Sequence, residues 1–196
     1  MLSLFIDTSY KYLSVVINKG DQIIASYCEE CFKRQSEELF MVLDNLFKTN
    51  NIDKKELSAV YITVVPGSYT GVRIALTLAK VFCSISKANL YTISTLKLYA
   101  GKKENCLVIM DARANRAYVG AYNKGACLLK DTVLPLEKIK IEGFNVVLDG
   151  ALVGKDNTVI DVVNNYMELK DEFELVEDVD HLTPVYLKES DEYYRW

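Results

Sequence analysis

Two stretches of this sequence share one form, in which an apolar strand-like segment runs directly into an aspartate. They are residues 2–7, which end in Asp7, and residues 106–111, which end in Asp111. Further strand-like segments follow each, and in the first copy a helix, a strand and a second helix come next. A repeated succession of elements indicates an internal duplication, so we predict an α/β protein of two duplicated lobes, each with a mixed sheet and flanking helices. The predicted lobes are residues 1–103 and a smaller lobe, residues 104–196.

Hydrophobic periodicity predicts two long helices in the first lobe. The first spans residues 36–48, with Ser36 as its N-cap and acidic residues in its first turn, where they complement the helix dipole. The second spans residues 72–86 and is apolar around most of its circumference, so it needs cover from a sheet and from a second helix or another chain. The other expected strands and helices are 13–18, 22–28, 58–64, 90–93, 94–101 (helix), 117–122, 126–133, 145–148, 156–166 (helix) and 174–177.

Composition and charge argue against several classes of protein. No apolar run reaches the ~18 residues of a membrane helix, and the chain opens as a strand with no signal peptide, so we expect a cytoplasmic protein. A net charge of −4 with scattered basic residues argues against direct binding of nucleic acid by this chain alone, but it leaves binding as part of a complex open. A single histidine, His181, cannot build a histidine metal site or a serine–histidine triad. Five cysteines without a secretory signal indicate reduced thiols.

Two lobes of this form resemble the actin-like ATPase (ASKHA, ribonuclease H-like) fold. In that architecture, acids at the strand ends and hydroxyls in the following turn hold phosphates and their cation. Asp7 and Thr8 in the first lobe, and Asp111 and Arg113 in the second, occupy these places. The glycines that let a backbone approach phosphate are missing from both turns. We therefore interpret these four residues as a vestigial phosphate site or as simple caps of the strand ends.

A set of motifs makes the resemblance more specific. The longest is a loop and helix start at residues 66–74, and five shorter matches appear in order along the chain. The motifs are Asp7-Thr8-Ser9, Gln35-Ser36-Glu37, Pro66-Gly67-Ser68-Tyr69-Thr70-Gly71-Val72-Arg73-Ile74, Lys80, Asp111-Ala112-Arg113 and Pro184-Val185-Tyr186-Leu187-Lys188. Together they resemble the TsaB (YeaZ) family, closely over residues 1–122 and more loosely afterwards. The family usually has His at position 35 and Gly at position 65, where this chain has Gln35 and Val65.

The resemblance implies a non-catalytic subunit of the machinery that makes threonylcarbamoyladenosine on tRNAs reading codons that begin with A. In that machinery TsaD carries the metal on a pair of histidines and transfers the threonylcarbamoyl group, and a small ATPase, TsaE, joins the pair. The resemblance therefore implies a heterodimer with TsaD, a homodimer when the chain is alone, tRNA contact only through the complex, and no membrane. It implies no catalytic residue, no metal and no tightly bound cofactor, with ATP or ADP expected only at a partner interface.

The two long helices are the expected docking surface, because a small sheet covers only one face of each. The resemblance implies that they meet the equivalent pair of helices of TsaD or of a second copy. The predicted contact residues are Leu39, Leu43, Phe47, Arg73, Leu76, Ala79 and Cys83. The alternative for each apolar member is packing under its own sheet. The aromatic end of the chain, residues 193–196, either docks in a groove or has no fixed place.

Two other functions compete with the scaffold hypothesis. One is a small ATP-binding kinase or hydrolase of the actin-like ATPase superfamily. Glycines in the two turns and an adenosine-binding loop would support this function. The other is a peptidase activity, which the single histidine and the absence of a readable nucleophile–base pair argue against.

Overall fold

The computed structural model describes residues 1–31, 34–184 and 187, and it divides into two compact units. The first unit contains Met1–Ile93 and Lys170–Pro184, and the second contains Ser94–Leu169. This division differs from the predicted boundary at residue 103. Residues 95–100 pack against strands of the second sheet, and residues after 169 return to pair with the first sheet.

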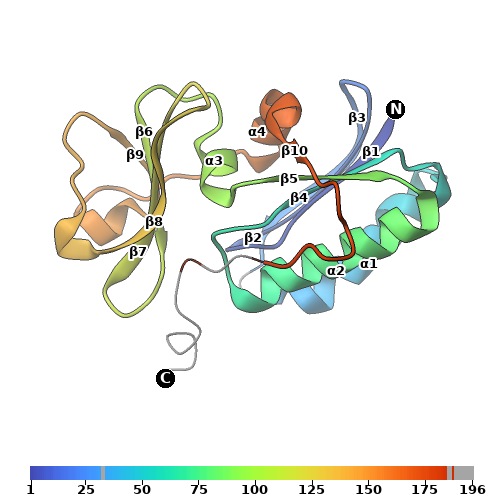
Figure 1. The fold of residues 1–196 in the computed structure, drawn as a ribbon, viewed down its shortest axis with the longest axis horizontal. Coiled ribbons are helices and arrows are strands. Elements are labelled where there is room, and N and C mark those ends of the chain that lie inside the picture. The colour runs from blue at the N-terminus through green and yellow to red at the C-terminus, as the bar shows by residue number, and fades with distance from the viewer. Residues whose placement is uncertain (32–33, 185–186, 188–196) are drawn as a thin grey trace. The chain divides into compact units, whose positions relative to one another are not determined.

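The first unit is built on a six-stranded sheet with the order β10-β5-β4-β1-β2-β3 (Figure 1). Its first three strands form an antiparallel meander, whereas β4 and β5 run parallel to β1 and are reached through helices. Its elements are β1 (Leu2–Asp7), β2 (Tyr12–Lys19), β3 (Gln22–Glu30), α1 (Gln35–Thr49), η1 (Lys54–Glu56), β4 (Ala59–Thr63), α2 (Tyr69–Ser86), β5 (Asn89–Ile93), η4 (Lys170–Glu172) and β10 (Glu174–Leu175).

Helices α1 and α2 lie side by side on one face of this sheet (Figure 1). Side chains alternate along a strand, so Leu4 and Ile6 of β1 join the core beneath the helices while Phe5 points to the other face. There Phe5 and Tyr61 each meet Phe173 edge to face, with ring centroids 6.3 and 5.2 Å apart. Both faces of β1, β2 and β4 are therefore buried, which explains their nearly continuous apolar sequences, whereas β3 and β10 are largely exposed.

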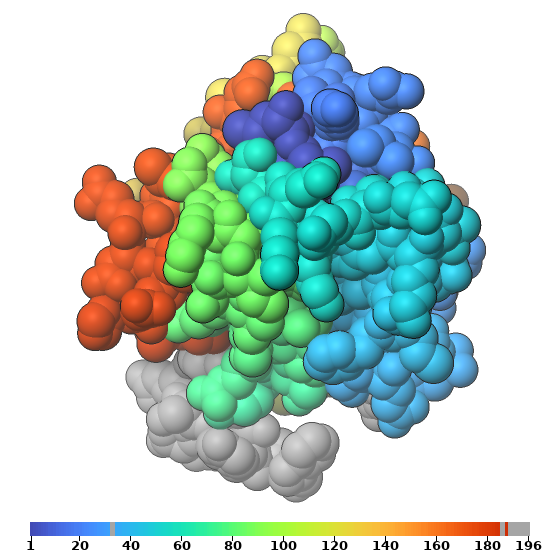
Figure 2. All heavy atoms as spheres, turned by 90° about the vertical axis from the view of Figure 1, so that its right-hand side faces the viewer, coloured from blue at the N-terminus to red at the C-terminus, as the bar shows by residue number. Residues whose placement is uncertain are grey.

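The segment 170–184 holds the end of the described chain against the first unit. Strand β10 pairs antiparallel with β5, and the Lys80 Nζ of α2 donates to the carbonyl oxygen of Asp180 at 2.8 Å. Figure 2 shows this segment in orange-red beside the green atoms that follow residue 75. The segment thus borders one flank of α2, on the side away from α1.

The second unit repeats the first four strands of the first. Its sheet has the order β8-β7-β6-β9, with a meander and one strand parallel to its first strand, as in β3-β2-β1-β4. This agreement of order and direction supports the predicted duplication. The elements are α3 (Thr95–Ala100), β6 (Cys106–Asp111), β7 (Arg116–Asn123), β8 (Ala126–Pro135), η2 (Leu136–Lys138), β9 (Asn145–Leu148), η3 (Gly150–Val153) and α4 (Val162–Leu169).

Every predicted strand and helix is present, but several ends differ. Helix α1 begins one residue earlier than predicted, and Arg34 is its N-cap, so the prediction of Ser36 as the cap is wrong. Helix α2 begins at Tyr69, because the Ser68 hydroxyl accepts a hydrogen bond from the amide of Gly71. Helix α4 begins only at residue 162. The residue before it, Asp161, accepts a hydrogen bond at its carboxylate from the amide of Asn164.

A polar cluster joins the start of α3 to the second sheet. The carboxylate of Asp131 on β8 accepts hydrogen bonds from the hydroxyls of Ser94 and Tyr122. Ser94 also caps α3, since its oxygen accepts from the amide of Lys97 at 3.1 Å. Burial raises the pKa of Asp131, although the two hydroxyl donors act in the opposite direction. The folded chain therefore holds the Asp131 proton more tightly than the unfolded chain does.

The free energy of unfolding should depend less on pH in the Asp131→Asn variant than in the parent. With a raised folded pKa, the contribution of Asp131 is fully present below the usual carboxyl pKa of about 4 and is lost as pH rises through the folded value. Asparagine cannot ionise, and both hydroxyls can turn to accept from its amide. Urea unfolding from pH 4 to pH 7 should show a smaller loss of stability in the variant. The exposed Asp21→Asn serves as control, and identical pH profiles for parent and Asp131→Asn would contradict this account.

Candidate functional site

The aspartate that ends β1 is engaged entirely by its own chain. The Asp7 carboxylate accepts hydrogen bonds from the amide and hydroxyl of Ser9 and, at 2.6 Å, from the hydroxyl of Thr63 on β4. Its side chain is fully buried. The acid predicted to belong to a phosphate site therefore ties the ends of two parallel strands together.

Thr8, the residue after Asp7, holds the turn that follows β1 against the start of α2. The Thr8 hydroxyl donates to the carbonyl oxygen of Gly71 at 2.7 Å, and the Ser68 amide donates to the carbonyl oxygen of Ser9 at 2.6 Å. A Cβ at position 71 would overlap the Thr8 carbonyl oxygen, and one at Gly67 would lie 2.7 Å from the Ser9 carbonyl oxygen. The glycines of the 66–71 loop are thus needed for close approach of two backbones.

The start of α1 is attached to the same turn. The Gln35 amide nitrogen donates to the carbonyl oxygen of Tyr10 at 2.6 Å, and Gln35 is buried. The Cys31 amide donates to the carbonyl oxygen of Lys11 at 2.8 Å. Gln35 therefore fills its position with a neutral donor, so this link between the turn and α1 does not titrate.

The second strand-end acid lies in the second unit, in a different setting. Asp111 accepts from the amide of Arg113 at 2.7 Å and pairs with its guanidinium at 3.2 Å, while its own amide donates to Asp149. The side chain of Arg113 is exposed, and Arg113, Ala114 and Asn115 all have positive φ. The structure thus brings Asp7 together with Thr8, and Asp111 together with Arg113. A phosphate site shared by the two pairs stays a prediction.

The predicted docking residues of α1 and α2 lie mostly inside the chain. All the apolar members are buried in the core of the first unit, between the helices and the sheet, and Arg73 alone is exposed. The buried members are Leu39, Leu43, Phe47, Leu76, Ala79 and Cys83. These six side chains therefore pack under their own sheet, as the alternative interpretation has it, because the most regular apolar stripe of each helix faces that sheet. Leu43 and Phe47 also line a hollow between the helices, and contact of any of the six with a partner stays a prediction.

Other apolar side chains of the same two helices face outward. Phe40 and Met41 of α1 are 59% and 64% exposed, and Val81 and Ile85 of α2 are 46% and 44% exposed. The sequence did contain a signal, since Phe40 directly follows the core residue Leu39 and so points about 100° away from it. These four residues form what we call the α1–α2 face.

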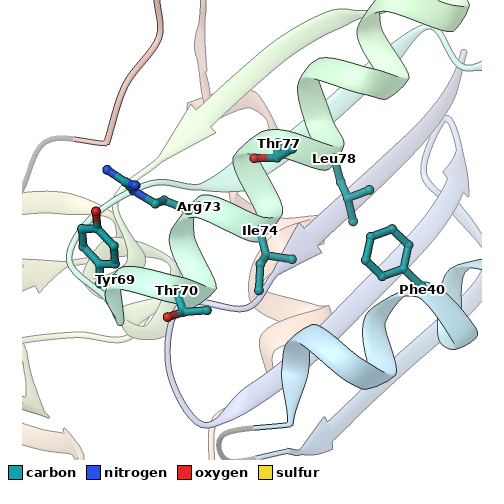
Figure 3. A pocket seen from close by; sticks show the side chains of 7 residues that line it. All are labelled: Phe40, Tyr69, Thr70, Arg73, Ile74, Thr77 and Leu78. Atoms are coloured by element: carbon teal, nitrogen blue, oxygen red, sulfur yellow. The ribbon is translucent and has the colours of Figure 1, made fainter.

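Two hollows run between the helices on this face. The larger has a volume of about 760 Å³ and extends past Phe47, Val81 and Ile85 towards the residues after α1. The smaller, of about 290 Å³, lies at the start of α2 (Figure 3). Phe40 and Leu78 line both, so the two hollows adjoin, and together they form what we call the groove of the helix pair.

The titratable side chains outside this face offer little chemistry. Burial raises the pKa of Cys31, Cys83 and Cys106 to about 11, so these thiols remain protonated at neutral pH. The His181 side chain is exposed and its Nδ1 lies 2.8 Å from Asp178. Within residues 1–31, 34–184 and 187 there is no group of three metal-ligating side chains and no helix long and apolar enough to cross a membrane.

Two predicted features fall outside the described residues in whole or in part. The aromatic end at 193–196 lies outside them, and so do positions 185, 186 and 188 of the last motif. Lys80, by contrast, is described, and its contact with Asp180 anchors the return segment.

Comparison with known proteins decides the family. The family model "TsaD: tRNA N6-adenosine threonylcarbamoyltransferase" matches residues 16–139. The tRNA threonylcarbamoyladenosine biosynthesis protein TsaB of Bacillus subtilis is 32% identical over 137 residues, which are 68% of this chain and 60% of the relative. The chain belongs to the TsaB (YeaZ) family. The TsaB of Buchnera aphidicola from Schizaphis graminum is 30% identical over 132 residues, 64% of this chain and 62% of the relative.

The alignments span about three fifths of the length of these TsaB relatives. The fold match extends further. YeaZ from Pseudomonas aeruginosa superimposes with a TM-score of 0.77 at 20% identity, covering 95% of this chain and 99% of that one. The predicted actin-like ATPase fold is therefore confirmed.

The Thr8→Val variant should lose stability while Thr8→Ser keeps it. Valine has nearly the shape of threonine but cannot donate to the Gly71 carbonyl, which would then be buried without this partner. The expected cost is about 1–3 kcal/mol of unfolding free energy. Serine retains the hydroxyl, so urea unfolding of Thr8→Ser should differ from the parent by less than about 1 kcal/mol. Equal destabilisation by both variants would show that the hydroxyl contact is not what holds the turn to α2.

Proposed function

We propose that this chain is a non-catalytic subunit in the synthesis of threonylcarbamoyladenosine on tRNA, and that it acts by binding the threonylcarbamoyltransferase TsaD through its α1–α2 face. Membership of the TsaB family supports the pathway, since the curated relatives carry that pathway in their names. In this proposal tRNA is contacted only through the complex, in the cytoplasm, and TsaE joins the assembled pair.

The exposed apolar groove is the observation that carries the docking proposal. Phe40, Val81 and Ile85 line the larger hollow between two adjacent helices and present large apolar side chains to water, and Met41, next to Phe40 in the sequence, is exposed as well. A contiguous apolar patch of this kind is costly on a free surface and is typical of protein–protein contacts. The helices themselves are fixed by the buried core and by the locked turn at Thr8 and Gly71, so the face is preformed.

The state of the first strand end supports a non-catalytic role. The Asp7 side chain is fully buried and its Oδ1 already accepts from Ser9 and Thr63, so this oxygen would have to give up those bonds to hold a cation. A hydrogen bond to a charged group contributes about 1.5–3 kcal/mol, so breaking these bonds is costly. We therefore place any ATP or ADP at a partner interface and not at Asp7 of the lone chain.

The decisive variant is Phe40→Asp, because it puts a charge in the middle of the groove without touching the core. It should weaken binding to the TsaD protein of the same organism by roughly 30-fold or more, about 2 kcal/mol, as for a central contact residue. Size-exclusion chromatography with light scattering and calorimetric titration would measure this. The earlier candidates Leu43 and Leu76 are unsuitable, since a charge there would disrupt the buried core.

Leu128→Asp is the matched control, because Leu128 is 55% exposed but lies on β8 in the second unit. It should bind TsaD like the parent. Failure of the parent chain to bind TsaD, with TsaE and ATP present, would overturn the proposal. Tight magnesium-dependent binding of ATP by the lone chain would instead favour the small kinase or hydrolase.

A further inference from the structure

The larger hollow of the groove has a buried aromatic floor under exposed aliphatic walls. Phe47 and Phe82 form the floor, where both rings are buried and their centroids lie 5.7 Å apart. Val81 and Ile85 of α2 are exposed and form a wall. The hollow has a volume of about 760 Å³, compared with about 290 Å³ for the smaller one, which it meets at Phe40 (Figure 3). The larger hollow is therefore the roomier part of the groove and rests directly on core side chains.

The lining of this hollow follows one stripe along each helix. The residues recur at spacings of three and four, so each stripe is about two turns, or roughly 10–12 Å, long. They are Phe40, Leu43, Asp44, Phe47 and Lys48 on α1, and Leu78, Val81, Phe82 and Ile85 on α2. A hollow between two such stripes suits a further helix that lies along them and carries apolar side chains at the same spacing.

The charged residues of this hollow lie at its rim. The Lys48 Nζ lies 2.7 Å from the Asp44 carboxylate, and the Asp53 carboxylate accepts from the Lys55 amide at 2.9 Å. The remaining charged residue of the lining, Lys54, is exposed to water. Exposed ion pairs contribute only about 0–1 kcal/mol, so exchanging these pairs for contacts with a partner gains little. A side chain that enters the hollow gains mainly from its apolar floor and walls.

We infer that the larger hollow is the energetic anchor of the groove, and that it receives a large apolar side chain, aromatic or long aliphatic, from a docked helix of TsaD. This inference rests on the proposed docking of TsaD. Binding energy at protein contacts concentrates in a few side chains that fill apolar pockets and are surrounded by a polar rim. The larger hollow has this arrangement, with Phe47 and Phe82 below and the Asp44–Lys48 pair at the rim. The smaller hollow adds contact area but little affinity.

Thr77 and Val81 allow a matched comparison of the two hollows. They stand one helical turn apart on α2 and both are exposed, but Val81 lines the larger hollow and Thr77 the smaller. Val81→Asp should weaken binding to the TsaD protein of the same organism roughly 30-fold or more, whereas Thr77→Asp should bind within about 3-fold of the parent. Calorimetric titration would measure both. Urea unfolding should show that neither variant loses the fold, since neither side chain belongs to the core.

A change of volume at position 81 separates a receiving hollow from a flat apolar patch. Val81→Ala removes apolar contact and should weaken binding roughly 5-fold. Val81→Trp adds apolar surface but takes up space in the hollow, so it should weaken binding as well, by roughly 10-fold or more. On a flat patch, the added surface would leave the affinity unchanged or raise it. Binding of Val81→Trp as tight as that of the parent, or tighter, would therefore contradict the inference.

Salt and temperature provide an independent readout. An apolar anchor predicts that affinity for TsaD changes by less than about 3-fold between about 50 and 500 mM salt. It also predicts a negative heat capacity change on binding, which should be smaller in magnitude for Val81→Ala. A steep loss of affinity with salt would show instead that charges supply most of the binding energy.

The possible results separate the two proposals. Parent-like binding of Val81→Asp, with Phe40→Asp still disruptive, would overturn the anchor and leave the docking face intact. Equal losses in Thr77→Asp and Val81→Asp would also overturn it, because the two hollows would then contribute alike. Absence of binding by the parent chain would overturn both proposals.

Discussion

The α1–α2 face depends on the contact between the turn after β1 and the loop that begins α2. Thr8 and Ser9 contact the backbone of Gly71 and Ser68 through hydrogen bonds of 2.7 and 2.6 Å. Only glycine at position 71 leaves room for that contact. These hydrogen bonds fix where α2 starts, and the first turn of α2 carries Tyr69 and Arg73. The geometry of the groove thus follows from a few contacts at the end of one strand.

The duplication gives the two units the same strand order but different strand-end chemistry. In the first unit the acid is buried and accepts from three groups of its own chain. In the second, Asp111 is partly exposed and pairs with an arginine in a turn of left-handed residues. Only glycine and, less readily, Asn or Asp adopt such a backbone without cost, so Arg113 and Ala114 make this turn strained.

Most of the fold could be predicted from sequence because it is encoded locally. Alternation and helical periodicity located every strand and both long helices, and the two aspartates revealed the repeat. The return of residues 170–184 to the first unit depends on the non-local contacts of Phe173 with Phe5 and Tyr61, which no local pattern reveals. The start of α2 was missed because a loop rich in glycine reads as non-helical, although Ser68 is a good N-cap.

The docking residues were harder to predict for a physical reason. The strongest apolar stripe of a helix faces whichever surface buries most area, and here that surface is the chain's own sheet. Phe40 and Val81 lie just beside that stripe, so their exposure depends on how α1 and α2 cross the sheet. A sequence locates the apolar residues of a helix but not the angle at which it packs. Arg73, the exposed member of the predicted set, stays a prediction as a docking residue.

Hydrogen–deuterium exchange of this chain, alone and with TsaD, tests the central claim most directly, because it reports every backbone amide in one experiment. The account predicts slower exchange in α1 and α2 on complex formation, with the hairpin of β7 and β8 unchanged. Protection confined to the second unit, or no change in either helix when the complex forms, would contradict the claim that the α1–α2 face is the docking surface.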